Sequence, residues 1–221
     1  MEIDSLDWIK SFKSISEKKM EKFARYGIMT LTVTNLKRIL ADPSYTLSDD
    51  GVLENMCRSR FYADLFVRHF ICYLDSVVEE TQDRETGRLR SRTEHFDLRR
   101  RNLGMVPSMD FVCIQFHLSD DMIDQEVIQR MTITTTDLIG IANDIYSYNV
   151  EQAGGQKCVV CNLVDVVLRE RGRGVQDAMD IIEKMYRDLF LSLVDDYNNF
   201  PTFKDAEQDR VLKEYALGML D

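Results

Sequence analysis

The sequence predicts an all-α protein, a helical bundle, from three observations. Apolar residues recur at intervals of three and four through most of the chain, which is the spacing of a helix face. Proline occurs only 3 times in 221 residues, so long stretches are free to remain helical. No segment alternates apolar and polar residues over any length, as a half-buried strand would. The length and a hydrophobic content of 44% are sufficient for a sizeable core.

The N-terminal part of the chain divides into two helical regions. Residues 1–44 are expected to form a moderately helical segment, with a rough apolar stripe within 6–40. Asp, Ser, Pro and Gly residues at 42–51 then predict a loop. A strong helix with a wide apolar face is expected from about 53 to 82, followed by a polar, arginine-rich connection around Gly87.

Five further helical stretches are predicted. The first begins near His95, is interrupted at 104–107 and resumes over 109–118. Ser119 and Asp120 are then expected to start a long helix that ends near Glu151, before a Gly-Gly pair. The remaining helices are predicted at 163–170, 175–197 and, more weakly, 206–220, and they complete an antiparallel bundle.

Composition excludes several classes of partner. A net charge of −10 argues against nucleic acid, because phosphate backbones bind basic surfaces. No run of eighteen apolar residues is present, so no membrane span is expected, and the N-terminus does not read as a secretory leader. Five irregularly spaced cysteines fit reduced thiols and predict a cytoplasmic protein. The oligomeric state is left open as a monomer or a homodimer.

One motif carries most of the chemical information: Asn143-Asp144-x-x-Ser147-x-x-x-Glu151. Asn143, Ser147 and Glu151, here called the metal motif, are four residues apart and lie along one stripe of a helix. Their amide, hydroxyl and carboxylate oxygens are the ligands that hard cations such as Mg²⁺ prefer. A solvated helix face would show the same spacing. The apolar segment that precedes the motif, 131–142, makes this alternative weaker, because a polar stripe on a buried helix needs partners.

The motif resembles the second metal-binding signature of class I terpene cyclases. Its continuation to Gln152 and Gly154-Gly155 is similar to fungal sesquiterpene synthases. Upstream, Leu98-Arg99-Arg100-Arg101-Asn102-Leu103-Gly104, followed by Pro107-Ser108, resembles the segment that carries the family's diphosphate-sensing arginine. Residues 162–164 and 175–179 continue the likeness. The resemblance covers 45–221, which is expected to be a terpene synthase-like helical domain, whereas 1–44 is an atypical N-terminal helical segment.

The resemblance implies a set of functional residues. Asn143, Ser147 and Glu151 would hold Mg²⁺ against the diphosphate of a prenyl substrate, and Asp144 would be structural. Arg100 would sense the diphosphate, with Arg99 as the alternative. The helix break at Gly104 would turn its backbone toward the reacting cation. The residues expected to line an apolar substrate pocket are Phe61, Phe66, Met105, Phe111, Thr136, Ile139 and Gly140.

Two parts of the family pattern are not found, and the bundle is therefore expected to be incomplete at both ends. The literal aspartate-rich match, 120–124, follows the sensor segment and lies roughly 28 Å along a helix from the metal motif, too far to share its cations. A second candidate, Asp49-Asp50 with Glu54, falls in a predicted loop. The family's Arg-Tyr pair is also not found near the C-terminus.

Three functions remain open at this stage. The first is a Mg²⁺-dependent sesquiterpene synthase that ionises and cyclises farnesyl diphosphate and releases diphosphate. The second is a catalytically inactive relative that binds diphosphate or a partner chain without turnover. The third, ranked last, is a prenyl-chain-elongating transferase, whose family carries two aspartate-rich motifs instead of an Asn/Ser/Glu triad.

Overall fold

A computed structural model describes residues 60–153, 161–172, 174–203 and 205–220. The chain divides into two compact units, Met1–Arg68 and His69–Asp221. Within the described ranges the secondary structure is helical and no strand occurs, which confirms the all-α prediction. The predicted segment 1–44 and the candidate Asp49-Asp50 with Glu54 lie outside these ranges.

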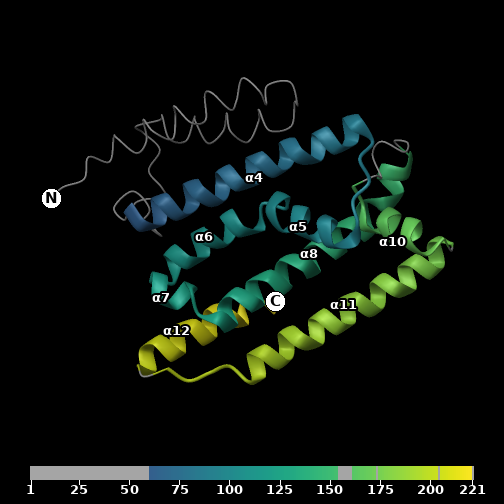
Figure 1. The fold of residues 1–221 in the computed structure, drawn as a ribbon. Coiled ribbons are helices and arrows are strands. Elements are labelled where there is room, and N and C mark those ends of the chain that lie inside the picture. The colour runs from purple at the N-terminus through teal and green to yellow at the C-terminus, as the bar shows by residue number, and fades with distance from the viewer. Residues whose placement is uncertain (1–59, 154–160, 173, 204, 221) are drawn as a thin grey trace. The chain divides into compact units, whose positions relative to one another are not determined.

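The described helices are α4 to α8 and α10 to α12 (Figure 1). Their bounds are α4 Arg60–Thr86, α5 Arg92–Asn102, α6 Met105–Gln115, α7 Asp120–Ile123, α8 Glu126–Ala153, α10 Leu163–Arg171, α11 Val175–Asn198 and α12 Ala206–Leu217. Within the second unit, α8 is the central helix and packs against α5, α6, α10 and α11. No helix of the described ranges is both long enough and apolar enough to cross a bilayer.

The helix ends follow from local chemistry. Ser91 and Glu94 form a reciprocal capping box that starts α5. Asn162 caps α10 through its side-chain oxygen, and Asp205 does the same for α12. Gly172 ends α10 with a φ of +62°, a conformation that glycine adopts without strain.

The core consists of two clusters along α8. The first lies between α6, α8, α11 and α12, and its buried members are Cys113, Leu118, Val127, Ile128, Met131, Leu138, Leu193, Leu212, Tyr215, Ala216 and Met219. The second lies between α8, α10 and α11, and its buried members are Ile141, Tyr148, Leu163, Val164, Val167, Ala178 and Ile182. Each fully buried aliphatic side chain contributes about 1.5–3 kcal/mol. The second cluster fixes the metal-motif end of α8.

One predicted helix start was wrong. Ser119 begins the short helix α7 without a side-chain capping bond, and α7 ends before α8 starts at Glu126. Asp120 and Asp121 occupy the first turn of α7, where acidic side chains interact favourably with the free backbone N–H groups. The literal aspartate-rich match, 120–124, therefore lies on a separate four-residue helix and the residue after it, not on the helix of the metal motif.

Candidate functional site

Gly140 brings α5 close to α8 beside the metal motif. A Cβ atom at Gly140 would lie 3.1 Å from Leu103 Cδ1 and 3.9 Å from Arg99 Cβ, so even a methyl group there would require the Leu103 side chain to shift. Gly140 is buried beneath the end of α5, and its expected role in lining a pocket stays a prediction. This close approach places the Arg99 side chain against Asn143 and Asp144.

Asp144 anchors three segments to one another. Only 2% of its surface is exposed. Its carboxylate accepts hydrogen bonds from Arg99 Nη2 at 2.5 Å and from the Leu163 backbone N–H at 2.9 Å, and it lies 2.9 Å from His95 Nε2. Both oxygens are therefore engaged by protein groups, and α5, α8 and the start of α10 meet at this carboxylate.

The three side chains of the metal motif point to two neighbouring groups. Asn143 is exposed, and its Oδ1 accepts a 2.7 Å bond from Arg99 Nη2. Ser147 and Glu151 are half-buried, and both lie beside the amide nitrogen of Asn162. The distances from Asn162 Nδ2 are 3.4 Å to Ser147 Oγ and 3.1 Å to Glu151 Oε2. Two of the three oxygens thus converge on one point occupied by a donor.

The two candidate sensor arginines have different partners. Arg99 contacts the metal motif through Asn143, and its buried Nε has no hydrogen-bond acceptor among the described residues. Arg100, which was preferred from the sequence, instead makes two 2.7 Å bonds to the buried carboxylate of Asp137. These bonds raise the pKa of Arg100. Neighbours on a helix point about 100° apart, which explains why only Arg99 lies at the motif.

The helix is interrupted at Gly104 between α5 and α6, as predicted, but it resumes at Met105 and not at 109, so Pro107 lies within α6. The φ of Gly104, +72°, is in the left-handed region. Its carbonyl accepts hydrogen bonds from the backbone N–H and the hydroxyl of Ser108, at 3.2 and 2.8 Å. A Cβ atom at Gly104 would lie 3.6 Å from the ring of Tyr73. The break is therefore a defined turn, and its role in a reaction remains a prediction.

The other predicted pocket residues have varied environments. Met105 and Phe111 are half-buried, Thr136 is buried and Ile139 is 41% exposed. Phe66 is buried and belongs to the first unit, and the side chain of Phe61 is not among those described. Thr136 donates to the backbone carbonyl of Thr132 at 2.7 Å. Their contact with a substrate stays a prediction.

A cavity of about 800 Å³ lies near the opposite end of α8. Its lining comes from the end of α6, from α7 and from α12, and includes Phe116, His117, Met122, Arg210 and Val211. None of the predicted pocket residues lines it. Met122 and Asn143 are separated by most of α8, so this cavity is not part of the metal motif.

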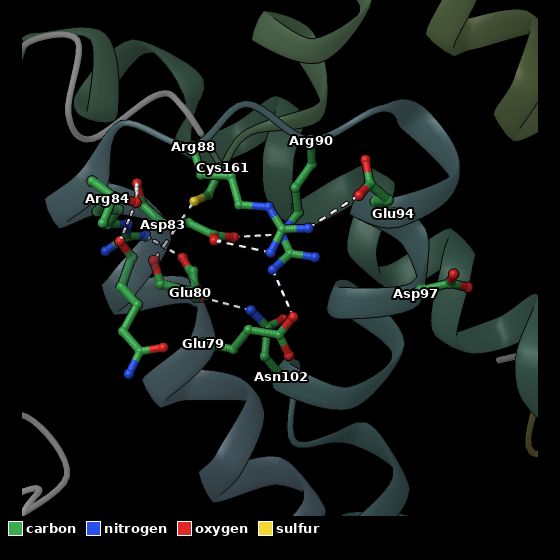
Figure 2. A network of polar contacts seen from close by, with 12 residues as sticks. Glu79, Glu80, Asp83, Arg84, Arg88, Arg90, Glu94, Asp97, Asn102 and Cys161 are labelled. Atoms are coloured by element: carbon green, nitrogen blue, oxygen red, sulfur yellow. Dashed lines mark hydrogen bonds and ion pairs between the residues drawn. The ribbon is translucent and has the colours of Figure 1, made fainter.

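A second polar network joins α4 to α5 beside the motif (Figure 2). The Arg90 guanidinium bonds to Asp83 and, at 2.7 Å, to Glu79, and Arg101 also pairs with Glu79 at 2.9 Å. Asn102 donates to Glu80 at 2.6 Å. Burial raises the pKa of a Glu carboxyl, but the bonds from Arg90 and Arg101 outweigh it and lower the pKa of Glu79.

The carboxylates of this network do not form a metal cluster. Within the ranges that the structure describes, no group of three or more His, Cys, Asp or Glu side chains is arranged to hold a metal ion. Cys161 lies beside the Glu80 backbone carbonyl, and burial raises the pKa of its thiol to about 11. Cys161 is therefore a protonated thiol, as expected for a structural residue.

Sequence reasoning did not identify Asn162, His95 or Asp137 as partners of the motif and the arginines. Asn162 precedes an apolar run and is a favourable N-cap residue, so its capping role was accessible from the sequence. Its contacts to Ser147 and Glu151 cross 15 and 11 residues, through a segment whose path cannot be derived from local spacing.

Comparison with known proteins identifies the family. Residues 31–190 match the family described as "Terpene synthase family 2, C-terminal metal binding". The chain is 36% identical over 154 residues to sesquiterpene synthase 9 of Postia placenta, covering 70% of this chain and 44% of that protein. It is 32% identical over 154 residues to a Δ(6)-protoilludene synthase of Stereum hirsutum, covering 70% of this chain and 41% of that protein. The chain spans less than half the length of these curated relatives.

Solved structures share the fold. The linalool/nerolidol synthase of Streptomyces clavuligerus matches with a TM-score of 0.68 at 16% identity, over 99% of this chain and 79% of that one. A hedycaryol synthase matches with a TM-score of 0.60 at 15% identity, over 74% of this chain and 56% of that one. The family match covers more than half of the sequence. The chain therefore belongs to the class I terpene synthases.

Proposed function

We propose that this chain acts in a Mg²⁺-dependent sesquiterpene synthase that ionises farnesyl diphosphate, cyclises the resulting cation and releases diphosphate. The observation that carries the proposal is the stripe of Asn143, Ser147 and Glu151 beside the guanidinium of Arg99. The similarity to fungal sesquiterpene synthases supports a substrate of fifteen carbons.

The donor set fits Mg²⁺. All three side chains of the metal motif offer hard oxygen atoms, and Ser147 Oγ and Glu151 Oε2 already converge on a common point. Such a small set of protein ligands is typical of Mg²⁺ sites that share the ion with substrate phosphates. When bound, the ion would neutralise charge that develops on the diphosphate. Asn143, Ser147 and Glu151 would hold it at this end of α8.

Arg99 is the better candidate for the diphosphate contact. Its Nη2 already lies at the motif, and its buried Nε lacks an acceptor among the described residues, which is a costly arrangement for a donor. Diphosphate oxygens would provide acceptors, and a planar guanidinium matches them. Arg100 is held by Asp137 and would need to give up two bonds to a buried carboxylate.

The hydrocarbon part of the substrate would lie next to apolar side chains of α8. Ile139 is one helical turn before Asn143 and is 41% exposed. An apolar surface next to the charged site would let the prenyl chain leave water while its diphosphate stays at the motif. The turn at Gly104 lies between α5, which carries Arg99, and α6. Because glycine has no side chain, the backbone at this turn would be open to the substrate.

The proposal is tested by incubating the purified chain with farnesyl diphosphate and Mg²⁺ and measuring hydrocarbon products and released diphosphate. Glu151→Gln should lower turnover by about 100-fold or more. Even the loss of a group that only orients a metal ligand typically lowers metal affinity or activity by about 10–100-fold. Glu126→Gln is the matched control, since its side chain is on the same helix and 95% exposed. A wild-type chain that forms no product but binds Mg²⁺ and diphosphate would identify the inactive alternative instead.

A further inference from the structure

We propose that Asn162 is a positioning residue for the metal motif. In this inference, which rests on the proposed function, the Asn162 amide holds Glu151 in the orientation that a cation requires, and it links the start of α10 to the site. Asn162 is 1% exposed, so its polar atoms are satisfied by the protein and not by solvent.

The amide nitrogen of Asn162 faces three oxygens of α8. The distances from Nδ2 are 2.8 Å to the Asp144 carbonyl, 3.1 Å to Glu151 Oε2 and 3.4 Å to Ser147 Oγ. An amide has two N–H donors, and the two shortest contacts use them. The bond to Oε2 restricts the rotation of the Glu151 carboxylate, so its second oxygen is left for a cation.

The amide oxygen of Asn162 has a different task. It accepts a 2.9 Å bond from the Val164 backbone N–H and thereby caps α10. The next residue, Leu163, donates its backbone N–H to the buried carboxylate of Asp144. The start of α10 is thus tied to α8 at adjacent residues, and the position of the Asn162 nitrogen relative to the motif is fixed from both sides.

Asparagine suits this position because it combines a donor and an acceptor on one short side chain. Serine retains a capping oxygen, but its hydroxyl is too short to reach Glu151 as well. Asn162→Ser therefore separates the two tasks: the cap is kept and the contact to the motif is lost. Removing a group that orients a metal ligand typically weakens metal binding by about 10–100-fold.

The experiment measures binding of Mn²⁺, as a probe for Mg²⁺, to the full chain in the presence of inorganic diphosphate, with free Mn²⁺ followed by electron paramagnetic resonance. Asn162→Ser should raise the Mn²⁺ dissociation constant by about 10-fold or more. The control is Asp205→Ala, which removes the analogous cap of α12, since Asp205 accepts from Glu207 and Gln208 N–H groups far from the motif. This control should leave Mn²⁺ binding unchanged, and circular dichroism verifies that each variant is folded.

A double-variant cycle separates positioning from general destabilisation. If Asn162 acts through Glu151, then Asn162→Ser combined with Glu151→Gln should bind Mn²⁺ no more weakly than Glu151→Gln alone. Additive losses, or an Asn162→Ser variant with unchanged affinity, would overturn the inference while the proposed function stands. A wild-type chain that binds no Mn²⁺ with diphosphate would instead overturn the proposed function.

Discussion

Two polar networks lie near each other in this protein and differ in how completely they are satisfied. In the network between α4 and α5, Arg90 pairs with two carboxylates, and one of these, Glu79, pairs in turn with Arg101 (Figure 2). In the network around the metal motif, the Glu151 carboxylate accepts a hydrogen bond from the neutral amide of Asn162 and interacts electrostatically with Arg84, and Arg99 retains a buried donor without an acceptor among the described residues.

We interpret the network between α4 and α5 as structural, and the network around the metal motif stays the predicted functional one. Buried charges that are matched within the protein leave nothing for a ligand to satisfy. The motif network has a buried guanidinium donor, Arg99 Nε, without an acceptor among the described residues, which suits a ligand that carries an anion. Substitutions should therefore affect stability in the first network and ligand binding in the second.

The largest expected effect on stability and ligand binding comes from replacing one arginine in each network, Arg90 and Arg99. Arg90→Met should lower the free energy of unfolding by about 3–5 kcal/mol, because it leaves the buried Asp83 carboxylate without its main partner. Arg99→Met should cost less, since Asp144 keeps its contacts with His95 and the Leu163 N–H. Arg99→Met should instead abolish the gain in thermal stability from Mg²⁺ with diphosphate. Urea unfolding and thermal shift measure both; equal losses of stability would contradict the comparison.

A smaller effect is expected at two glycines with the same left-handed backbone conformation. Gly104 has a φ of +72° and Gly87 a φ of +67°. An alanine at either position should cost about 1–2 kcal/mol of unfolding free energy, because Cβ crowds the carbonyl in the left-handed region. Gly87 has no atom within 4 Å of the new Cβ, so Gly87→Ala is the control for strain alone.

The two glycine variants also test whether the turn at Gly104 belongs to the functional site. Gly104→Ala should lower product formation more than Gly87→Ala does, because Gly104 sets the direction of α6 directly after the arginine helix. Both variants are compared in urea unfolding and in the product assay. Equal activity of the two variants would remove Gly104 from the site and leave it as a turn residue only.

The helices were predictable because their information is local. Apolar spacing predicted the order of α4, α5, α6, α8, α10, α11 and α12, and Gly104 predicted the interruption between α5 and α6. The prediction failed where local signals compete: the segment at Asp124 and Gln125 separates α7 from α8, although the apolar pattern continues nearby. Spacing gives the phase of a helix but not the point at which the backbone leaves it.

The site was predictable only in part for a related reason. The stripe of Asn143, Ser147 and Glu151 follows directly from a period of four residues. Three consecutive arginines, by contrast, carry no signal for which one faces α8, and the answer depends on the close approach at Gly140. The contact between Asn162 and Glu151 depends on the chain path between α8 and α10, which no local pattern encodes.

The smallest expected effect is a dependence of stability on pH at Glu94, which pairs with Arg88 next to the network between α4 and α5. Glu94 accepts hydrogen bonds from the Ser91 backbone N–H and hydroxyl and from Arg88, which lower the pKa of its carboxyl to about 2. Because this pKa lies below the ordinary value of 4.5, ionised Glu94 stabilises the fold at higher pH. That contribution is lost as pH falls from the ordinary value toward 2.

The comparison of wild type with Glu94→Gln isolates this contribution. The difference in their unfolding free energies should be largest near neutral pH and should shrink steadily as the pH of the urea titration is lowered below the ordinary pKa of a glutamate. Gln keeps the shape of the capping box, so the difference reports the charge and not the loss of the cap. A difference that stays constant with pH would mean that the carboxylate gains nothing from Ser91 and Arg88. The capping box would then contribute only geometry to the start of α5, the helix that places Arg99.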